Sequence, residues 1–192
     1  MRRIVLASRS SARKRLLRQT GVRFKVIPSR IPEDETRPLA SEMQIRNLAL
    51  AKARDVASRM KSGIVIGADT VIIHGRKIIG KPRNRGEARR ILSLLNGSTH
   101  RIVTGIAVVD AATRKEVTAT VKTLVKMKRM SNREIESYVA TGEPLGKAGA
   151  YAVQGKGAIF IERIDGCYYN VVGLPLPRLA DLLKRFESPL IR

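Results

Sequence analysis

The stretch Ile4–Leu17, "IVLASRSSARKRLL", indicates the fold class, because a short apolar run leads directly into serines and basic residues. The apolar run predicts a buried strand over Arg3–Ala7. The pattern that follows predicts a helix over Ser11–Gln19, with Leu16 and Leu17 turned inward. A strand that passes directly into a helix is typical of α/β proteins.

The junction between this strand and this helix has two interpretations. A helix N-terminus offers unpaired backbone N–H groups and the positive end of the helix dipole, which suits a phosphate group. Ser8 and Ser10 add hydroxyl donors, and the guanidinium of Arg13 can hold two phosphate oxygens. Serines before a helix are more often plain N-caps, here before a solvated basic face. The stretch alone leaves both interpretations open.

The rest of the chain continues the alternation of strands and helices. Further strands are predicted over Arg23–Ile27, Arg101–Val109, Glu116–Lys126 and Ala158–Ile164. Further helices are predicted over Ser41–Met60, Gly86–Leu95, Asn132–Ala140 and Pro177–Phe186. Between them, Gly63–Pro82 predicts two apolar strand runs that are interrupted at Gly67–Thr70. The alternation predicts an α/β fold, and we expect one domain over residues 1–192.

Composition limits the class of protein. The 192 residues include one cysteine and no tryptophan, and 43% of them are hydrophobic. A chain of this length can bury a substantial core. The single Cys167 rules out an internal disulfide and favours a reducing compartment. Because no apolar run is as long as a membrane span and no signal peptide is recognisable, we expect a cytoplasmic protein without a membrane partner.

The net charge is the unusual feature of the composition. Lysine and arginine number 38 against 16 acidic residues, which gives a formal charge of +22. Such a field attracts nucleic acid, nucleotides or acidic membranes. A general basic surface of a thermophilic or halotolerant host explains the charge equally well. A nucleic-acid-binding protein is therefore one alternative, although the sequence shows no aromatic stacking platform or known binding motif.

Acidic and basic residues follow several of the predicted strands. Asp69 in "IGADTVI" could be a metal ligand, a general base or a capping carboxylate, and Lys81 in "GKP" follows another apolar run. The acidic loop Glu33–Glu35 could join Asp69 in holding a hard cation, because Mg²⁺ takes carboxylates together with phosphate oxygens. Singly, each of these residues is typical of a solvated loop. Together they favour phosphoryl chemistry assisted by a metal.

The histidines and two of the tyrosines are not assigned to the chemistry. We expect His74 to lie at a strand end and His100 to support the turn in "STHRIVTG", and we propose no metal pair from them. We expect Tyr168 and Tyr169 to serve packing rather than base stacking, with the alternative that one of them does both.

Six blocks of the sequence occur in an order and at spacings that resemble a known family. They are "LASRSSARKRLL", "GADTVI", "GKP", "LNGSTHRIVTG", "EPLGKAGAYAVQG" and "IDGCYYNVVGLPL". Together they resemble the Maf family of nucleoside triphosphate pyrophosphatases, the septum-formation-inhibitor-like proteins. The resemblance implies a curved mixed central sheet with flanking helices, in two lobes around a nucleotide cleft, similar to the inosine-triphosphatase proteins. It also implies a divalent cation, Mg²⁺ or Mn²⁺, and a homodimer.

The resemblance further implies a reaction and its residues. A nucleoside triphosphate and water would give the monophosphate and pyrophosphate. Asp69 corresponds to the family's proton acceptor and, with Glu33, to a metal ligand; Lys81 and Glu33 would join it in catalysis. Ser8, Arg13, Lys52 and Glu35 would bind substrate. The acidic loop residue has two candidates, because counting back from Lys52 selects Glu33 and the appearance of "DET" selects Glu35.

The blocks resemble most closely the branch of the family that acts on dTTP and UTP. Its specificity positions correspond to Ala12, Thr70 and Gln154, and the last two agree with that branch. A glutamine amide can read a pyrimidine edge with one donor and one acceptor. The first block departs from the usual "SPRR", since Ser11 replaces the proline and Ala12 the first arginine. A cell-division regulatory protein that keeps the fold without strong catalysis is the second alternative.

Overall fold

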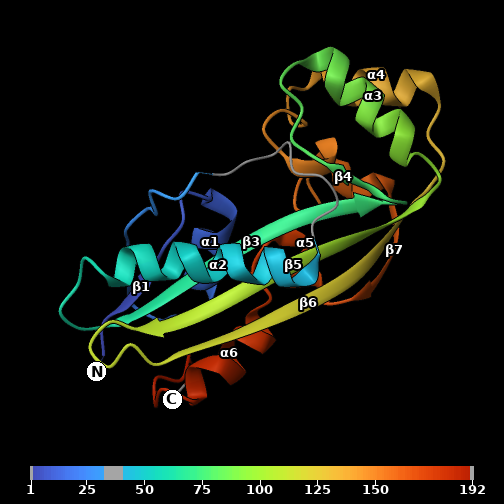
Figure 1. Ribbon diagram of the computed structural model, residues 1–192. Helices are drawn as coiled ribbons and strands as arrows, with labels where there is room; N and C mark the ends of the chain where they lie inside the picture. Colours follow the sequence, from blue (N-terminus) through green and yellow to red (C-terminus); the bar gives the residue numbers. More distant parts are fainter. Residues whose placement is uncertain (1, 33–40, 191–192) are drawn as a thin grey trace.

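The computed structural model describes residues 2–32 and 41–190, and a mixed seven-stranded sheet forms its centre (Figure 1). The strands are β1 (Ile4–Leu6), β2 (Phe24–Val26), β3 (Ile64–His74), β4 (Lys77–Ile79), β5 (Thr99–Asp110), β6 (Glu116–Met127) and β7 (Ile161–Gly166). Their order is β2-β1-β3-β5-β6-β7, with β4 paired to β3. The pairs β1–β2 and β1–β3 are parallel and the others antiparallel, which confirms the predicted α/β fold with a mixed sheet.

Helices cover both faces of the sheet. They are α1 (Ser11–Gln19), α2 (Glu42–Ala57), α3 (Arg85–Leu95), α4 (Asn132–Ala140), α5 (Tyr168–Val172) and α6 (Leu176–Lys184), with two 3₁₀ turns, η1 (Ala148–Ala150) and η2 (Lys156–Phe160). In Figure 1, α2 crosses β3 and β5 on one face, while α3 and α4 lie together beyond the far end of the long strands. Side chains of α1 and α6 share a core with the other face of β1, β3 and β5.

Serine side chains cap the first turns of two of these helices. Ser10 accepts a hydrogen bond from the backbone N–H of Arg13, and Ser41 forms a reciprocal capping box with Gln44. Leu16 and Leu17 are buried in the core, as the helical spacing predicts. The sequence pattern therefore locates the starts of α1 and α2 correctly.

The interruption predicted at Gly67–Thr70 is wrong, because β3 runs unbroken through these residues. Asp69 pairs with Gly105 and Thr70 with Thr104 on β5. The small residues serve helix packing instead: a Cβ atom on Gly67 would collide with the carbonyl oxygen of Ala49 in α2. A Cβ on Gly105 would lie 2.6 Å from the carbonyl oxygen of Ile45 in the same helix. The two glycines let the backbone of α2 rest directly on the sheet.

One edge of β3 nevertheless lacks a partner in its middle. On the side away from β5, β1 pairs with Ile64–Ile66 and β4 pairs with Ile72–His74. Within the described part of the chain, Gly67–Val71 has no strand partner on that side. Asp69 and Thr70 therefore lie at an open flank of the central strand.

The C-terminal third departs from prediction in two places. The strand predicted over Ala158–Ile164 is wrong in its first half, because η2 occupies Lys156–Phe160 and β7 begins at Ile161. The short helix α5 was not predicted, since five residues are too few to show a helical period. The buried Asn170 holds α5 by donating to the carbonyls of Ile102 and Val121.

The two tyrosines of α5 have different environments. Tyr169 packs against the core, as expected, whereas Tyr168 is exposed. The difference follows from α5 itself, which offers only part of its short surface to the sheet.

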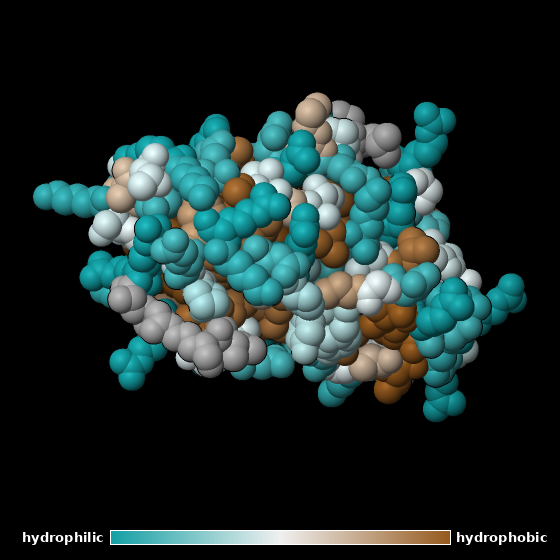
Figure 2. All heavy atoms as spheres, turned by 90° about the horizontal axis from the view of Figure 1, so that it is seen from below, coloured by the Kyte–Doolittle hydropathy of each residue, from teal (hydrophilic) through white to brown (hydrophobic). Residues whose placement is uncertain are grey.

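The surface is largely hydrophilic. Figure 2 shows one face on which hydrophilic residues predominate, with hydrophobic residues exposed between them. Several acidic side chains form ion pairs with basic residues of other elements, such as Glu116 with Arg54 and Glu162 with Lys126. Among the described residues, no helix has both the length and the apolar character needed to cross a membrane.

Candidate active site

A cavity of about 750 Å³ lies at the open flank of β3 and gathers the residues that the sequence singles out. Eight of the ten predicted site residues line it: Ser8, Ala12, Arg13, Lys52, Asp69, Thr70, Lys81 and Gln154. The other two, Glu33 and Glu35, lie outside the described residues. The described segment before them, Ser29–Pro32, also lines the cavity.

The opening serines divide between the two interpretations of the first junction. Ser10 is the N-cap of α1, where its Oγ accepts from the backbone N–H of Arg13 at 3.3 Å. Ser8 is buried, and its Oγ accepts from the backbone N–H of Ser10 at 3.2 Å and from Nη1 of Arg13 at 3.4 Å. Both serines line the cavity, so capping and site formation coexist in this stretch.

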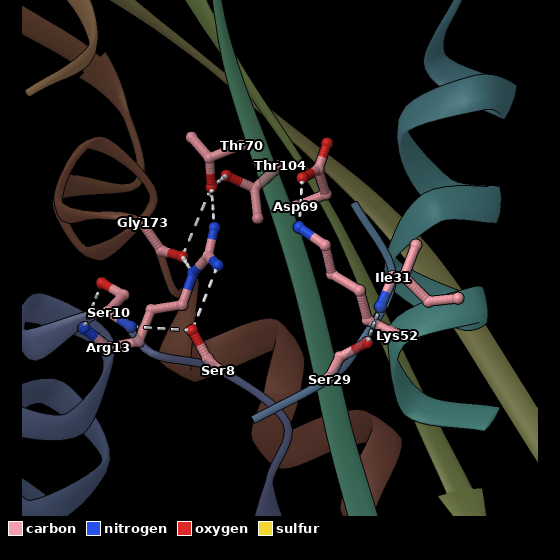
Figure 3. Close-up of polar contacts among 10 residues, drawn as sticks. All are labelled: Ser8, Ser10, Arg13, Ser29, Ile31, Lys52, Asp69, Thr70, Thr104 and Gly173. Atoms are coloured by element: carbon pink, nitrogen blue, oxygen red, sulfur yellow. Dashed lines mark hydrogen bonds and ion pairs between the residues drawn. The ribbon is translucent and has the colours of Figure 1, made fainter. Parts of the chain in front are cut away.

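Arg13 joins three separate parts of the chain. Its Nε donates to the carbonyl oxygen of Gly173 at 2.8 Å, and its Nη2 donates to Oγ1 of Thr70 at 2.9 Å (Figure 3). The Thr70 hydroxyl also shares a hydrogen bond of 2.9 Å with the buried hydroxyl of Thr104. Only 9% of Arg13 is exposed, so these contacts orient a guanidinium before any ligand arrives.

Lys52 and Asp69 form an ion pair on the opposite face of β3. Nζ of Lys52, from α2, lies 2.8 Å from Oδ1 of Asp69, and the side chains are 4% and 14% exposed. Asp69 and Thr70 are consecutive in a strand, so their side chains point to opposite faces, as Figure 3 shows. Lys52 reaches Asp69 because α2 rests on the sheet at Gly67. The partly buried carboxylate is thereby compensated and held in one orientation.

Basic side chains dominate the lining of the cavity. Arg9, Arg15, Arg30 and Lys147 line it in addition to the basic residues named above. Among the described residues, Asp69 is the one acidic residue in the lining. Arg30 lies outside the six sequence blocks, and Lys147 lies within the block "EPLGKAGAYAVQG" without having been singled out as a site residue. A lining of this charge favours a ligand with several negative charges.

The apolar part of the lining contains Tyr151, which contacts a buried histidine. The hydroxyl of Tyr151 lies 2.7 Å from Nε2 of His100, which is 1% exposed. Burial, and to a smaller extent the charge of His74, lowers the pKa of His100 to about 4, so this imidazole is neutral at neutral pH. The expectation that His100 supports a turn is wrong, because it lies within β5, whereas His74 does end β3.

The donor set in the cavity bears on the metal that the resemblance implies. Among residues 2–32 and 41–190, no three His, Cys, Asp or Glu side chains lie close enough together to hold a metal ion. Mg²⁺ is commonly held by one or two carboxylates and completed by substrate phosphates and water. Asp69 beside a basic cavity of about 750 Å³ fits an ion that binds together with a nucleotide.

Comparison with known proteins identifies relatives across nearly the whole chain. A family model described as Maf-like protein matches residues 3–186. A dTTP/UTP pyrophosphatase of Pelotomaculum thermopropionicum is 48% identical over 186 residues, which is 97% of each chain. A dTTP/UTP pyrophosphatase of Acetivibrio thermocellus is 47% identical over 199 residues, covering 100% of this chain and 99% of the relative.

A third relative gives the same result. A dTTP/UTP pyrophosphatase of Methanosarcina mazei is 47% identical over 186 residues, which is 96% of this chain and 94% of the relative. With the six sequence blocks, the mixed sheet and the cavity, these matches show that the chain belongs to the Maf family.

Proposed function

We propose that this protein is a nucleoside triphosphate pyrophosphatase that hydrolyses dTTP and UTP to the monophosphate and pyrophosphate. The observation that carries the proposal is that one cavity is lined by Asp69, Lys52, Arg13, Lys81, Thr70 and Gln154 together. Relatives at 47–48% identity over nearly their full length bear the name of this activity. The alternative of a regulatory protein without strong catalysis does not explain a fixed, basic cavity with one oriented carboxylate.

The basic residues would bind and neutralise the triphosphate. Ser8, Arg13, Lys52 and Lys81 offer hydroxyl, guanidinium and ammonium donors around the cavity. The oxygen of a water molecule would form a bond to the α-phosphorus, and the bond from that phosphorus to the bridging oxygen would break. Pyrophosphate would leave with the electron pair. Positioning and charge stabilisation, rather than covalent catalysis, would supply most of the rate.

Asp69 would accept the proton of the attacking water. The ion pair with Lys52 fixes the orientation of this carboxylate, which lines the cavity. Lys81 lines the same cavity and would stabilise the charge that develops on the phosphates. The roles of Glu33 and Glu35, which lie outside the described residues, stay predictions of the resemblance.

A divalent cation, Mg²⁺ or Mn²⁺, belongs to this proposal. Asp69 and Glu33 would be its ligands from the protein. When bound, the ion would neutralise phosphate charge and favour ionisation of the attacking water. Asp69 would then orient that water as well as accept its proton.

Selectivity for dTTP and UTP would come from Thr70, Gln154 and Ala12. The side-chain amide of Gln154 can pair with a pyrimidine edge through one donor and one acceptor. Thr70 holds Nη2 of Arg13 and so links this selectivity to phosphate binding. The homodimer, the cytoplasmic location and an additional affinity for nucleic acid stay predictions.

Product analysis tests the proposal. The protein is incubated with dTTP, UTP and other nucleoside triphosphates, with Mg²⁺, with Mn²⁺ or with a chelator, and the products are separated by chromatography. We expect the monophosphate and pyrophosphate from dTTP and UTP, only with a divalent cation. Nucleoside diphosphate and orthophosphate would contradict the proposed reaction. No turnover, combined with steeply salt-dependent binding of RNA or DNA, would favour the nucleic-acid alternative.

A further inference from the structure

We propose that Glu143 and Tyr138, which lie outside the cavity, are positioning residues that set nucleotide selectivity by holding the turn that carries Gln154. The inference rests on the proposed function, because it assumes that Gln154 contacts the base. Neither residue lines the cavity, and the sequence blocks assign no role to either. Their contacts with the backbone on both sides of the turn carry the proposal.

The turn itself spans Ala152–Gly155. The backbone N–H of Gly155 donates to the carbonyl oxygen of Ala152 at 3.1 Å, so Gln154 occupies the third position. Gln154 is exposed and lines the cavity. The direction of its amide toward a ligand therefore depends on how firmly the two ends of this turn are held.

The carboxylate of Glu143 holds the residues that follow the turn. Its Oε2 accepts from the backbone N–H of Lys156 at 2.9 Å, and its Oε1 accepts from the backbone N–H of Gly157 at 3.3 Å. These N–H groups belong to the first turn of η2, which offers them without partners in the 3₁₀ helix. Glu143 thus fixes the start of η2, directly after Gly155.

The phenol of Tyr138 holds Ala152, the first residue of the turn, and connects it to the same carboxylate. Its oxygen accepts from the backbone N–H of Ala152 at 3.1 Å, and its hydroxyl donates to Oε1 of Glu143 at 3.1 Å. Tyr138 is buried in α4, and its ring packs edge-on against Phe160 at 5.3 Å between centroids. One end of the turn is therefore tied to the Glu143 carboxylate directly, and the other end is tied to it through the buried Tyr138.

The glycines of this segment permit the close approach that these bonds require. A Cβ atom on Gly155 would collide with the carboxylate of Glu143. A Cβ atom on Gly157 would lie 2.5 Å from the hydroxyl of Tyr138. Gly155 has a φ of −126°, which an alanine can adopt, so Gly155→Ala would displace the carboxylate without straining the backbone.

The charge of Glu143 agrees with this arrangement. Partial burial raises the pKa of its carboxyl, but the N–H groups of Lys156 and Gly157 and the hydroxyl of Tyr138 outweigh burial and keep this pKa below its ordinary value. Glu143 is therefore an ionised acceptor for three donors at neutral pH. A glutamine in its place would turn an NH₂ group toward donors that need an acceptor.

The test compares kcat and KM for UTP and CTP, which differ at one edge of the base. For Glu143→Gln we expect the selectivity for UTP over CTP, measured as the ratio of kcat/KM, to fall about tenfold, the loss expected for one misplaced hydrogen-bonding group. The loss should lie in the KM for UTP, with kcat within about twofold of wild type. Glu134→Gln is the matched control, because the Glu134 carboxylate also caps a helix: it bonds the N-cap residue Ser131 at the start of α4. The control should keep the wild-type ratio.

A double-mutant cycle separates positioning from a general effect on stability. In the Gln154→Ala background, Glu143→Gln should cause no further loss of selectivity, because the group it positions is already absent. Tyr138→Phe and Gly155→Ala should reproduce the loss seen with Glu143→Gln, and they serve in its place if that variant does not fold. An unchanged UTP-to-CTP ratio in folded Glu143→Gln, or an equal loss with and without Gln154, would overturn the inference. If wild type releases no pyrophosphate from UTP, the proposed function itself fails.

Discussion

The cavity has two walls that are built in different ways. The sheet-side wall is formed by Ser8, Arg13, Lys52, Asp69 and Thr70. Asp69 and Thr70 lie on β3, Arg13 and Lys52 on helices α1 and α2 that pack on the same sheet, and Ser8 in the segment between β1 and α1. The loop-side wall is formed by Gly146–Gln154. Its one regular element is the short 3₁₀ turn η1. Charges that must be placed accurately lie on the first wall, and the residue proposed to read the base lies on the second.

The two walls also differ in what holds them. On the sheet-side wall the functional residues bind one another directly, as in the Lys52–Asp69 pair and the Arg13–Thr70 bond. On the loop-side wall the support comes from residues behind the cavity, namely Glu143, Tyr138 and His100. Changes to the first wall should therefore reduce turnover, whereas changes behind the second should alter selectivity or stability.

The largest effect is expected on the sheet-side wall. Asp69→Asn keeps the size of the side chain and an acceptor for Lys52 but removes the base, so kcat should fall by roughly 10²–10⁴-fold. Steady-state pyrophosphate release measures the loss, and circular dichroism checks that the fold is kept. Asp110→Asn is the matched control, because it also breaks a partly buried ion pair, with Arg2, outside the cavity. A rate near wild type for Asp69→Asn would leave Asp69 with a structural role only.

An intermediate effect is expected behind the loop-side wall, and it concerns pH. The pKa of His100 is lowered to about 4 from 6.5, so the unfolded chain binds the proton more readily and stability falls as pH falls through this interval. This one group should cost about 2 kcal/mol of unfolding free energy between pH 7.5 and pH 5.

Urea unfolding at both pH values measures this loss. His100→Gln should flatten the dependence, whereas His74→Gln should leave most of it, because burial is the larger cause of the shift. An equally steep dependence in His100→Gln would show that other groups govern the acid sensitivity.

The smallest effect is expected at Ala12, which directly precedes Arg13 of the sheet-side wall. Its side chain lines the cavity at the start of α1, where Arg9 and Arg15 also contribute charge. Ala12→Arg adds a charged donor, and we expect the preference for dTTP and UTP over other nucleotides to rise about threefold to tenfold. This gain is smaller than that of a full hydrogen bond to a charged group, because neighbouring cations already supply part of the interaction with the nucleotide.

The measurement is kcat/KM for a panel of nucleotides at one ionic strength, because the positive field is strong. Gln19→Arg, at the other end of α1, adds the same charge away from the cavity and serves as the control. An unchanged ranking in Ala12→Arg would mean that position 12 does not read the nucleotide.

What the sequence predicts well are the features that depend on neighbouring residues. The strand before Ser8 and the starts of α1 and α2 all follow from local spacing. Of the sheet-side wall, Ser8, Arg13, Asp69 and Thr70 lie in the short blocks that carry the resemblance. The structure brings them, with Lys52, to one cavity.

The features that the sequence does not predict depend on distant contacts. The contact between His100 and Tyr151 joins residues 51 positions apart, and nothing local in either segment indicates it. The Gly67–Thr70 segment was misinterpreted for a related reason. Small residues within an apolar run look like a break in a strand, and only the placement of α2 on the sheet reveals that they accommodate a helix backbone.

The open flank of β3 has a consequence for amide hydrogen exchange. Central strands usually contain the slowest-exchanging amides of a protein, because their opening requires nearly global unfolding. Here Gly67–Val71 lies at the centre of the sheet, and among the described residues it has no strand partner on one side. Amides directed to that side should therefore exchange with solvent, while amides bonded to β5 stay protected. A nucleotide in the cavity would shield this short segment, which makes its exchange rate a direct report of occupancy in the intact protein.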